Sequence, residues 1–305
     1  MTAIKQTKVI RFDWAIKHLL RDKANFDVLE GFLSAVLNRD IHILQILESE
    51  SNQSADNDKF NRVDLLAENQ AGEKLIIEVQ NNHEAHYLER LLYGTSKLIV
   101  DHMKLGYPYK DVKKVISINI LYFILGYGLD DYVYYGKTEF RGIHSNQLLK
   151  LRRKQQQTLS TIESHEIFPE YYLIEVEKFQ DLIQNDLDEW IYLLKHEAVR
   201  DDFKSASINT AKQKLDYLKL PPDHKKSYER YLENLAIAKD VIDNAHEEGW
   251  DKGIKQGKTE GKIEGIQEKA IDSARKMLTD GLDMNLISKY TGITVAEIKQ
   301  LSPLE

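Results

Sequence analysis

The sequence contains no cysteine among its 305 residues. Disulfide bonds and thiolate-bound zinc are therefore excluded, and the composition fits a reducing cytoplasm. Long hydrophobic runs are missing too. The longest, residues 116–125 (ISINILYFIL), has about half of the ~20 apolar residues that a membrane span requires and contains Ser117 and Asn119. The opening MTAIKQTKVIRFDW lacks the apolar run of a signal peptide. We therefore expect a cytoplasmic protein outside the membrane and predict a buried strand in 116–125.

An excess of positive charge is also absent. Lys and Arg number 42 against 49 Asp and Glu, which gives a formal net charge of -7. The protein as a whole is therefore no basic nucleic-acid coat, and any contact with DNA must use local patches. Apolar residues make up 42% of the chain, which is sufficient for a sizeable core. The length suits two ordinary domains or one large domain with extensions.

Apolar periodicity predicts the elements that come first in the chain. Apolar residues recur three and four positions apart in 12–20 and in 26–37, which indicates two amphipathic helices. Two short apolar segments, 62–67 and 74–80, flank Asn69, Gln70 and Gly72, as in a β-hairpin. Further along, the pattern predicts a short strand in 41–47, a helix in 86–104, strands within 112–125 and 162–179, and mostly helix from 187 onward.

The composition changes near Ala245. Five glycines, at positions 249, 253, 257, 261 and 265, recur every four residues among Lys, Glu and Gln. After residue 270, the apolar pattern predicts three short helices broken at Gly281 and at Thr291-Gly292. We therefore predict a large α/β domain in 1–244, a Gly-x-x-x-Gly connector in 245–270 and a small helix-turn-helix-like end in 271–305.

Three polar residues, Asp64, Glu78 and Gln80, stand within the apolar strands of the expected hairpin. Side chains alternate along a strand, so Glu78 and Gln80 point the same way. A tight turn near Ala71 would place Asp64 opposite Glu78, with Cβ atoms about 5 Å apart. Two carboxylates at that distance repel unless a cation lies between them, and Mg²⁺ takes oxygen ligands. The pattern indicates a metal site, while solvent-facing residues on a half-buried hairpin remain the alternative.

The order of the motifs resembles that of the PD-(D/E)XK family transposases, also called recombination-promoting nucleases. The segment RVDLLAEN–QAGEKLIIEVQ is similar to the PD-(D/E)XK core, with an Asp on one strand and Glu-x-Lys or a variant on the next, here Glu78-Val79-Gln80. The same family order continues through FDWAIKHLL, YLERLLYG, YYLIEVEKF before LDEWIYLLK, the glycine connector and TDGLDMNLISKYTGITVAEIKQL.

This resemblance implies an α/β fold class, a restriction-endonuclease-like core of a mixed sheet flanked by helices, with a helical C-terminal extension. It also implies cleavage of DNA that depends on Mg²⁺ or another divalent cation and is linked to recombination or mobile elements. Asp64 and Glu78 would be metal ligands, and the backbone carbonyl of Val79 would complete the site. Gln80 takes the place of the usual lysine, whose charge it lacks, and would orient water or phosphate.

Six supporting residues follow from the same resemblance and from spacing. Asp13 would be an acid that supports the metal site and Lys17 a phosphate contact, unless the two form an exposed i,i+4 ion pair. Arg90 would hold the scissile phosphate with Tyr93 nearby, unless both only pack on a helix surface. Arg152 and Arg153, in the basic run 150–154, would contact the DNA backbone, unless the run is a solvated loop.

Several functions remain open from the sequence. The leading hypothesis is a Mg²⁺-dependent DNA endonuclease, and its rival is a catalytically silent DNA-binding protein in which Gln80 replaces lysine. A third is an assembly module, because residues 272–305 hold five acidic and four basic residues, a poor balance for binding DNA. The glycine repeat would be a flexible tether or a surface for close helix packing. Its regular period favours self-association, so we expect a homo-oligomer formed through the C-terminal region.

Overall fold

The computed structural model describes residues 5–47, 63–103, 108–126, 130–155 and 158–301. The chain divides into two compact units, the first ending at Glu229 and the second beginning at Arg230. Each unit has its own secondary structure and its own buried residues. Among the described residues, no helix combines the length and apolarity needed to cross a membrane.

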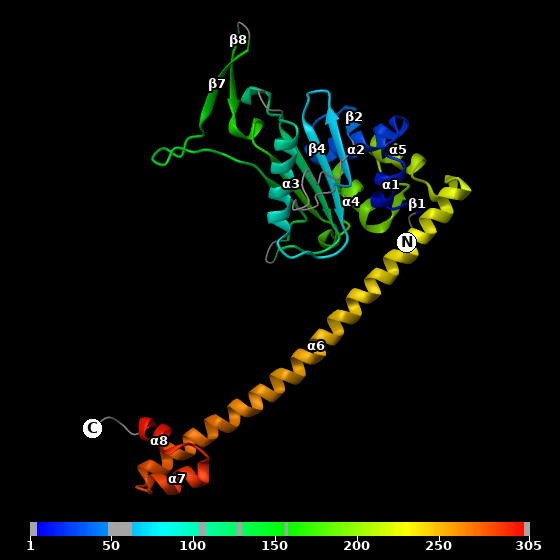
Figure 1. Cartoon of the computed structure of the whole chain (residues 1–305). Coiled ribbons are helices and arrows are strands. Elements are labelled where there is room, and N and C mark those ends of the chain that lie inside the picture. Colours follow the sequence, from blue (N-terminus) through cyan, green and yellow to red (C-terminus); the bar gives the residue numbers. More distant parts are fainter. Residues whose placement is uncertain (1–4, 48–62, 104–107, 127–129, 156–157, 302–305) are drawn as a thin grey trace. The chain divides into compact units, whose positions relative to one another are not determined.

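A six-stranded mixed sheet forms the centre of the first unit (Figure 1). The inner strands β4 and β5 are buried along almost their whole length, as expected of parallel strands that are covered on both faces. The strands, in their order across the sheet, are β2 (Ile43–Leu47), β3 (Leu65–Asn69), β4 (Lys74–Gln80), β5 (Val115–Leu121), β9 (Glu170–Glu175) and β6 (Val133–Gly136).

Helices cover both faces of this sheet, which confirms the predicted fold class. The helix α3 (Tyr87–Asp101) packs through Leu98 and Ile99 against Leu66 and Ile76 of the sheet. The remaining helices of this unit are α1 (Phe12–His18), α2 (Phe26–Leu37), α4 (Asp186–His196) and α5 (Ala206–Lys214).

Three aromatic rings join α1, α2 and α4. Phe12 lies 4.9 Å from Phe32 and 6.2 Å from Trp190, measured between ring centroids. Close packing of α2 against α5 requires a glycine, because a Cβ atom added at Gly31 would lie 2.5 Å from Cβ of Ser207. This packing fixes α1, which carries several residues of the candidate site.

The hairpin and the first two helices agree with the sequence patterns, but four other segments differ. The basic run 150–154 is not a loop: it lies within β7 (Lys150–Gln155), which pairs with β8 (Thr158–Glu163) in a separate two-stranded ribbon. The edge strand β6 was not expected. Two further short strands, β1 (Gln6–Lys8) and β10 (Ala198–Arg200), pair with each other and were also missed, because three-residue strands leave little periodicity to detect.

The second unit consists of helices. The long helix α6 (Pro222–Thr279) starts in the first unit and continues through all five repeat glycines. It is followed by α7 (Met284–Thr291) and α8 (Val295–Leu301). The predicted breaks are confirmed, because Gly281 and Gly292 adopt left-handed backbone conformations with φ of 79° and 74°, which favour glycine at helix ends. Ala274, Ile287 and Ile298 form the buried centre of this small bundle.

The glycine repeat is thus helical and not an unstructured tether. Glycine costs an isolated helix about 1 kcal/mol per residue relative to alanine, so tertiary contacts would ordinarily be needed to favour helix here. A Cβ atom added at any of the five glycines would meet no other heavy atom within 4 Å. Within the described chain, therefore, no close packing explains the small residues, and the predicted self-association remains a prediction.

Candidate functional site

Glu78 lies where β4 meets α3. Ile76, two residues earlier on the same face of the strand, packs against α3, so Glu78 and Gln80 face that helix as well. The Glu78 side chain is buried, with 6% of its residue surface exposed. Burial raises its pKa to about 7. The guanidinium of Arg90 opposes this shift, while the nearby carboxylates of Asp64 and Glu84 add to it.

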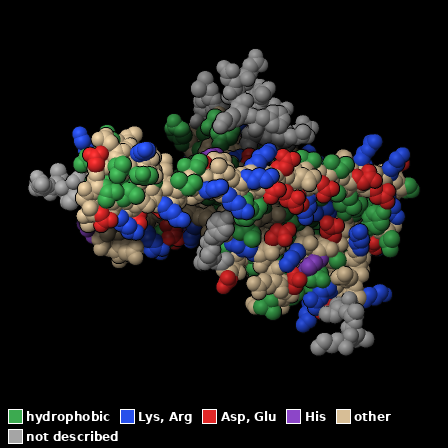
Figure 2. Space-filling view, turned by 90° about the horizontal axis from the view of Figure 1, so that it is seen from below, with side chains coloured by type: hydrophobic (Ala, Val, Ile, Leu, Met, Phe, Trp, Pro, Cys, Tyr) green, Lys and Arg blue, Asp and Glu red, His purple; other side chains and the backbone are tan. Residues whose placement is uncertain are grey.

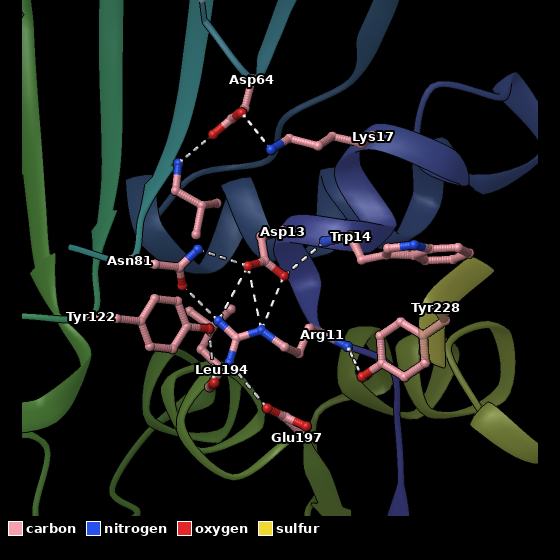
Figure 3. Close-up of polar contacts among 11 residues, drawn as sticks. Arg11, Asp13, Trp14, Lys17, Asp64, Asn81, Tyr122, Leu194, Glu197 and Tyr228 are labelled. Carbon is pink, nitrogen blue, oxygen red and sulfur yellow. Dashed lines mark hydrogen bonds and ion pairs between the residues drawn. The ribbon is translucent and has the colours of Figure 1, made fainter. Parts of the chain in front are cut away.

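Asp64 directly precedes β3 and continues the register of the hairpin. Leu65 pairs with Ile77 across the ladder, so the next position outward sets Asp64 opposite Glu78, as the sequence indicated. The backbone N–H of Val79 donates to Asp64 Oδ2 at 2.9 Å. This contact crosses from β4 to the residue before β3 (Figure 3).

A cationic edge formed by α1 and the residues after it lies next to Asp64. Lys17 Nζ lies 3.2 Å from Asp64 Oδ1, and Arg21 donates to the backbone carbonyl of Asp64 at 2.7 Å. Together with His18 and Val63, these residues line a hollow of about 510 Å³. An open hollow with a carboxylate and two cations on its wall can receive a phosphate beside the carboxylate pair.

Arg90 reaches the site from α3. Its Nη2 lies 3.6 Å from Glu78 Oε2, and its Nη1 contacts Glu84 Oε2. The side-chain amide of Gln80 donates to the same Glu84 oxygen at 3.4 Å. Tyr93 is not joined to this group by any hydrogen bond within the described parts of the chain, and it is 39% exposed.

Asp13 is also buried, with only 3% of its surface exposed. It accepts hydrogen bonds from the Arg11 guanidinium at 3.2 Å, from Asn81 Nδ2 at 3.2 Å and from the backbone N–H of Trp14 at 2.8 Å (Figure 3). The exposed ion pair between Asp13 and Lys17 that the spacing allowed is therefore wrong. Because Asn81 follows Gln80, this network holds the end of β4.

Arg11 connects that network to distant parts of the chain. Its side chain donates to Asn81 Oδ1 at 2.8 Å and to Glu197 at 3.1 Å. Its guanidinium lies 4.6 Å from the centre of the Tyr122 ring, and its backbone N–H donates to the Tyr228 hydroxyl at 3.0 Å. These contacts join the start of α1 to β4, α4 and the start of α6.

Sequence reasoning missed Arg11, Asn81 and Glu84. Arg11 and Asn81 adjoin predicted site residues in the chain, and that proximity was the only available signal. Glu84 lies in the irregular segment between β4 and α3, where no periodicity indicates the direction of a side chain. Only the tertiary structure reveals their contacts, of Arg11 with Asn81 and of Glu84 with Arg90 and Gln80.

The residues present fit a hard divalent cation. Glu78 Oε2 is buried and accepts no hydrogen bond within the described residues, so a carboxylate oxygen is left for another partner. The backbone N–H of Val79 faces Asp64, and the carbonyl of a strand residue points to the same side as its N–H. Two carboxylates and one carbonyl form an oxygen donor set suited to Mg²⁺. No group of three or more His, Cys, Asp or Glu is arranged to hold a metal anywhere in the described chain.

The basic ribbon is separate from this site. Arg152 pairs with Thr161 across the two strands and is exposed, while the side chain of Arg153 lies outside the described residues. The ribbon extends away from the six-stranded sheet (Figure 1), so the structure does not bring Arg152 to the carboxylates. In the view of Figure 2, basic and acidic side chains are interspersed, in agreement with the absence of overall positive charge.

Comparison with protein families gives two matches. Residues 10–245 match the family described as PD-(D/E)XK nuclease family transposase. Residues 267–303 match the C-terminal HTH domain of the Rpn/YhgA-like nuclease family. No curated protein and no solved structure matches the chain. The first match contains both carboxylates, and the second contains α7, α8 and the end of α6.

Proposed function

Since the chain belongs to the PD-(D/E)XK nuclease family transposases, we propose that it is a metal-dependent DNA endonuclease linked to recombination or mobile DNA. Asp64 and Glu78 would be the metal ligands, with the Val79 carbonyl as a third. The observation that carries this proposal is the buried Glu78 carboxylate, which faces Asp64 and has one oxygen without a hydrogen bond to any described residue. Such a pair is costly when both groups are ionised unless a cation joins them.

The chain's own groups prepare this site. The N–H of Val79 and the ammonium of Lys17 hold the Asp64 carboxylate in place. Burial raises the pKa of Glu78 to about 7, so the carboxyl is partly protonated at neutral pH, and that proton would leave when a cation binds. Bound Mg²⁺ would polarise the phosphodiester and make hydroxide available from water. Gln80 would orient the attacking water or a phosphate oxygen through its amide.

Lys17 supports an active enzyme over a silent relative. Gln80 lacks the positive charge of the lysine that usually occupies its position, but Lys17 places an ammonium 3.2 Å from Asp64. We propose that this charge, supplied from α1 instead of β4, stabilises the developing negative charge on the phosphate. Arg21 would bind an adjacent phosphate in the same hollow.

The C-terminal unit would contact DNA. Its match to an HTH domain supports this role, with α8 as the helix that enters the major groove. The near balance of charge in residues 272–305 predicts weak, modestly salt-dependent binding by this unit alone. The exposed Arg152 of the ribbon would add a backbone contact, with Arg153 beside it in the chain.

Incubation of the purified protein with plasmid DNA tests the proposal. Cleavage should require Mg²⁺, stop in EDTA and be lost in Asp64→Ala. Asp101→Ala is a matched control, because Asp101 has similar exposure and pairs with Lys97 at 3.5 Å. Binding of DNA without any cleavage would favour the catalytically silent alternative, and equal cleavage by Asp64→Ala would remove Asp64 from the site.

A further inference from the structure

Two donors from different elements meet at a single carboxylate oxygen. Arg90 on α3 and Gln80 on β4 both donate to Oε2 of Glu84. Both donors face the carboxylate pair, since Arg90 Nη2 lies 3.6 Å from Glu78 and Gln80 is two residues beyond Glu78. The oxygen of Glu84 therefore occupies a point at the edge of the site where a guanidinium and an amide converge.

Arg90 and Gln80 together form an anion-binding position, the anion seat. A guanidinium binds carboxylate and phosphate oxygens with the same fork of N–H groups. A neutral amide donates to either oxygen equally well. Nothing in the donor pair selects a carboxylate over a phosphodiester, so an oxygen of the DNA backbone could take the place of Glu84 Oε2.

The Glu84 carboxylate can leave the anion seat and be replaced by another anion. The Glu84 side chain is 39% exposed and that of Arg90 is 33% exposed. Glu84 belongs to the irregular segment between β4 and α3, whereas Arg90 and Gln80 belong to regular elements. The pair is only partly buried, and ion pairs in contact with solvent contribute at most about 1 kcal/mol, so the chain can release Glu84 at a cost of that order while the two donors stay in place.

We propose that Glu84 occupies the seat of a substrate phosphate and competes with DNA for Arg90 and Gln80. This inference rests on the proposed nuclease function. Glu84 leaves when a backbone phosphate arrives, and Arg90 then bridges that phosphate and Glu78. The carboxylate thus lowers affinity for DNA and keeps the guanidinium occupied when no substrate is present.

A rival role for Glu84 would be to orient Arg90 for catalysis. The two roles predict different changes in binding and kinetics. Removing a competitor lowers both Kd and KM for DNA, whereas removing a positioning group lowers kcat. Glu89 provides a matched control, because it lies in the first turn of α3 next to Arg90 in the chain, is 72% exposed and contacts only His86 among the described ion pairs.

The experiment compares the full-length protein with Glu84→Gln, Glu89→Gln and Glu84→Gln/Arg90→Gln, using fluorescence anisotropy of a labelled DNA duplex in EDTA and cleavage kinetics in Mg²⁺. Glu84→Gln should lower Kd roughly fivefold, equivalent to about 1 kcal/mol, and lower KM with it. Glu89→Gln, with the same change of charge, should change Kd by less than about twofold. The double variant should lose the gain.

Each contrary outcome has a definite meaning. If the wild-type protein cuts DNA but Glu84→Gln binds no tighter than Glu89→Gln, the competition is refuted and the nuclease function stands. A lower kcat with unchanged KM also refutes it, in favour of the positioning role. A gain that persists in the double variant would refute the seat at Arg90. A wild-type protein that neither binds nor cuts DNA overturns the proposed function and this inference together.

Discussion

Two buried carboxylates lie at the end of β4, and their surroundings differ. Asp13 is 3% exposed and Glu78 is 6% exposed. Asp13 accepts hydrogen bonds from a guanidinium, an amide and a backbone N–H. Glu78 has one oxygen with no hydrogen bond in the part of the chain that the structure describes, and its pKa is raised. A buried carboxylate with both oxygens hydrogen-bonded is typical of a structural network, whereas a buried carboxyl with an unpaired oxygen and a shifted pKa indicates a site for a ligand.

The largest effect should come from Glu78→Gln. The amide keeps the shape of the side chain but not its charge, so the proposed metal loses a ligand. We expect cleavage to fall on the order of a thousandfold, because a catalytic metal supplies several kcal/mol to the transition state. Plasmid cleavage measures this, with Glu170→Gln as the control, since Glu170 is also buried but pairs with Lys114 at 2.9 Å. Full cleavage by Glu78→Gln would contradict the proposed role of Glu78 as a metal ligand.

Asp13→Asn should act on stability instead. It removes the charge that balances Arg11 in a nearly buried network, and breaking a buried ion pair costs about 3–5 kcal/mol. Because Glu197 still pairs with Arg11, the lower end of that range is expected for the free energy of unfolding. Urea denaturation measures it. A variant as stable as the wild-type protein would mean that the network does not support β4.

The pH dependence of stability provides a separate test. In EDTA, native Glu78 keeps its proton up to about pH 7, whereas the unfolded chain releases it near its ordinary pKa of 4.5. The native state thus binds more protons in this window, so the free energy of unfolding falls as pH rises from 4.5 to 7 and then levels off. Glu78→Gln should therefore match the wild-type protein near pH 4 and exceed its stability by up to about 3 kcal/mol at pH 8. If the free energies of unfolding of the two proteins changed in parallel with pH, a raised pKa of Glu78 in the native state would be excluded.

Gln80→Ala should lower kcat about tenfold or more, since a hydrogen bond to a charged group contributes roughly 1.5–3 kcal/mol. If the amide acts in the transition state, DNA binding should change less than turnover. Gln45→Ala is a suitable control, because Gln45 also lies on a strand of the sheet and donates to a glutamate, Glu68, at 2.8 Å. An equal loss of binding, with turnover preserved, would make Gln80 a substrate anchor only.

The smallest effect is expected at the glycines, which also differ in whether they contact other residues. Gly31 is packed against Ser207, whereas a Cβ atom added at any of the five repeat glycines of α6 would contact no other described part of the chain within 4 Å. Alanine at Gly253 and Gly257 should stabilise the helix by about 1 kcal/mol each. If these glycines allow a second chain to approach closely, as we propose, the same change should also weaken self-association measured by light scattering. A wild-type protein that is monomeric at micromolar concentration would refute the assembly.

The sequence by itself determined the hairpin and the pairing of Asp64 with Glu78. Both follow from local geometry: strand side chains alternate with a period of two, and a short turn sets the register. It also determined the breaks at Gly281 and Gly292, because left-handed backbone conformations favour glycine. Local rules of this kind act over a few residues and can be read from spacing.

Only the tertiary structure decided the partners of these groups. Lys17 and Asp64 are far apart in the chain, as are Arg11 and Asn81, and no periodicity relates them. Their contacts arise because helix packing, fixed by rings such as Phe12, Phe32 and Trp190, sets where α1 meets the sheet. Ion pairs and hydrogen bonds depend on distances of a few ångströms. Folding therefore decided that both oxygens of Asp13 accept hydrogen bonds, whereas Oε2 of Glu78 accepts none from the described residues.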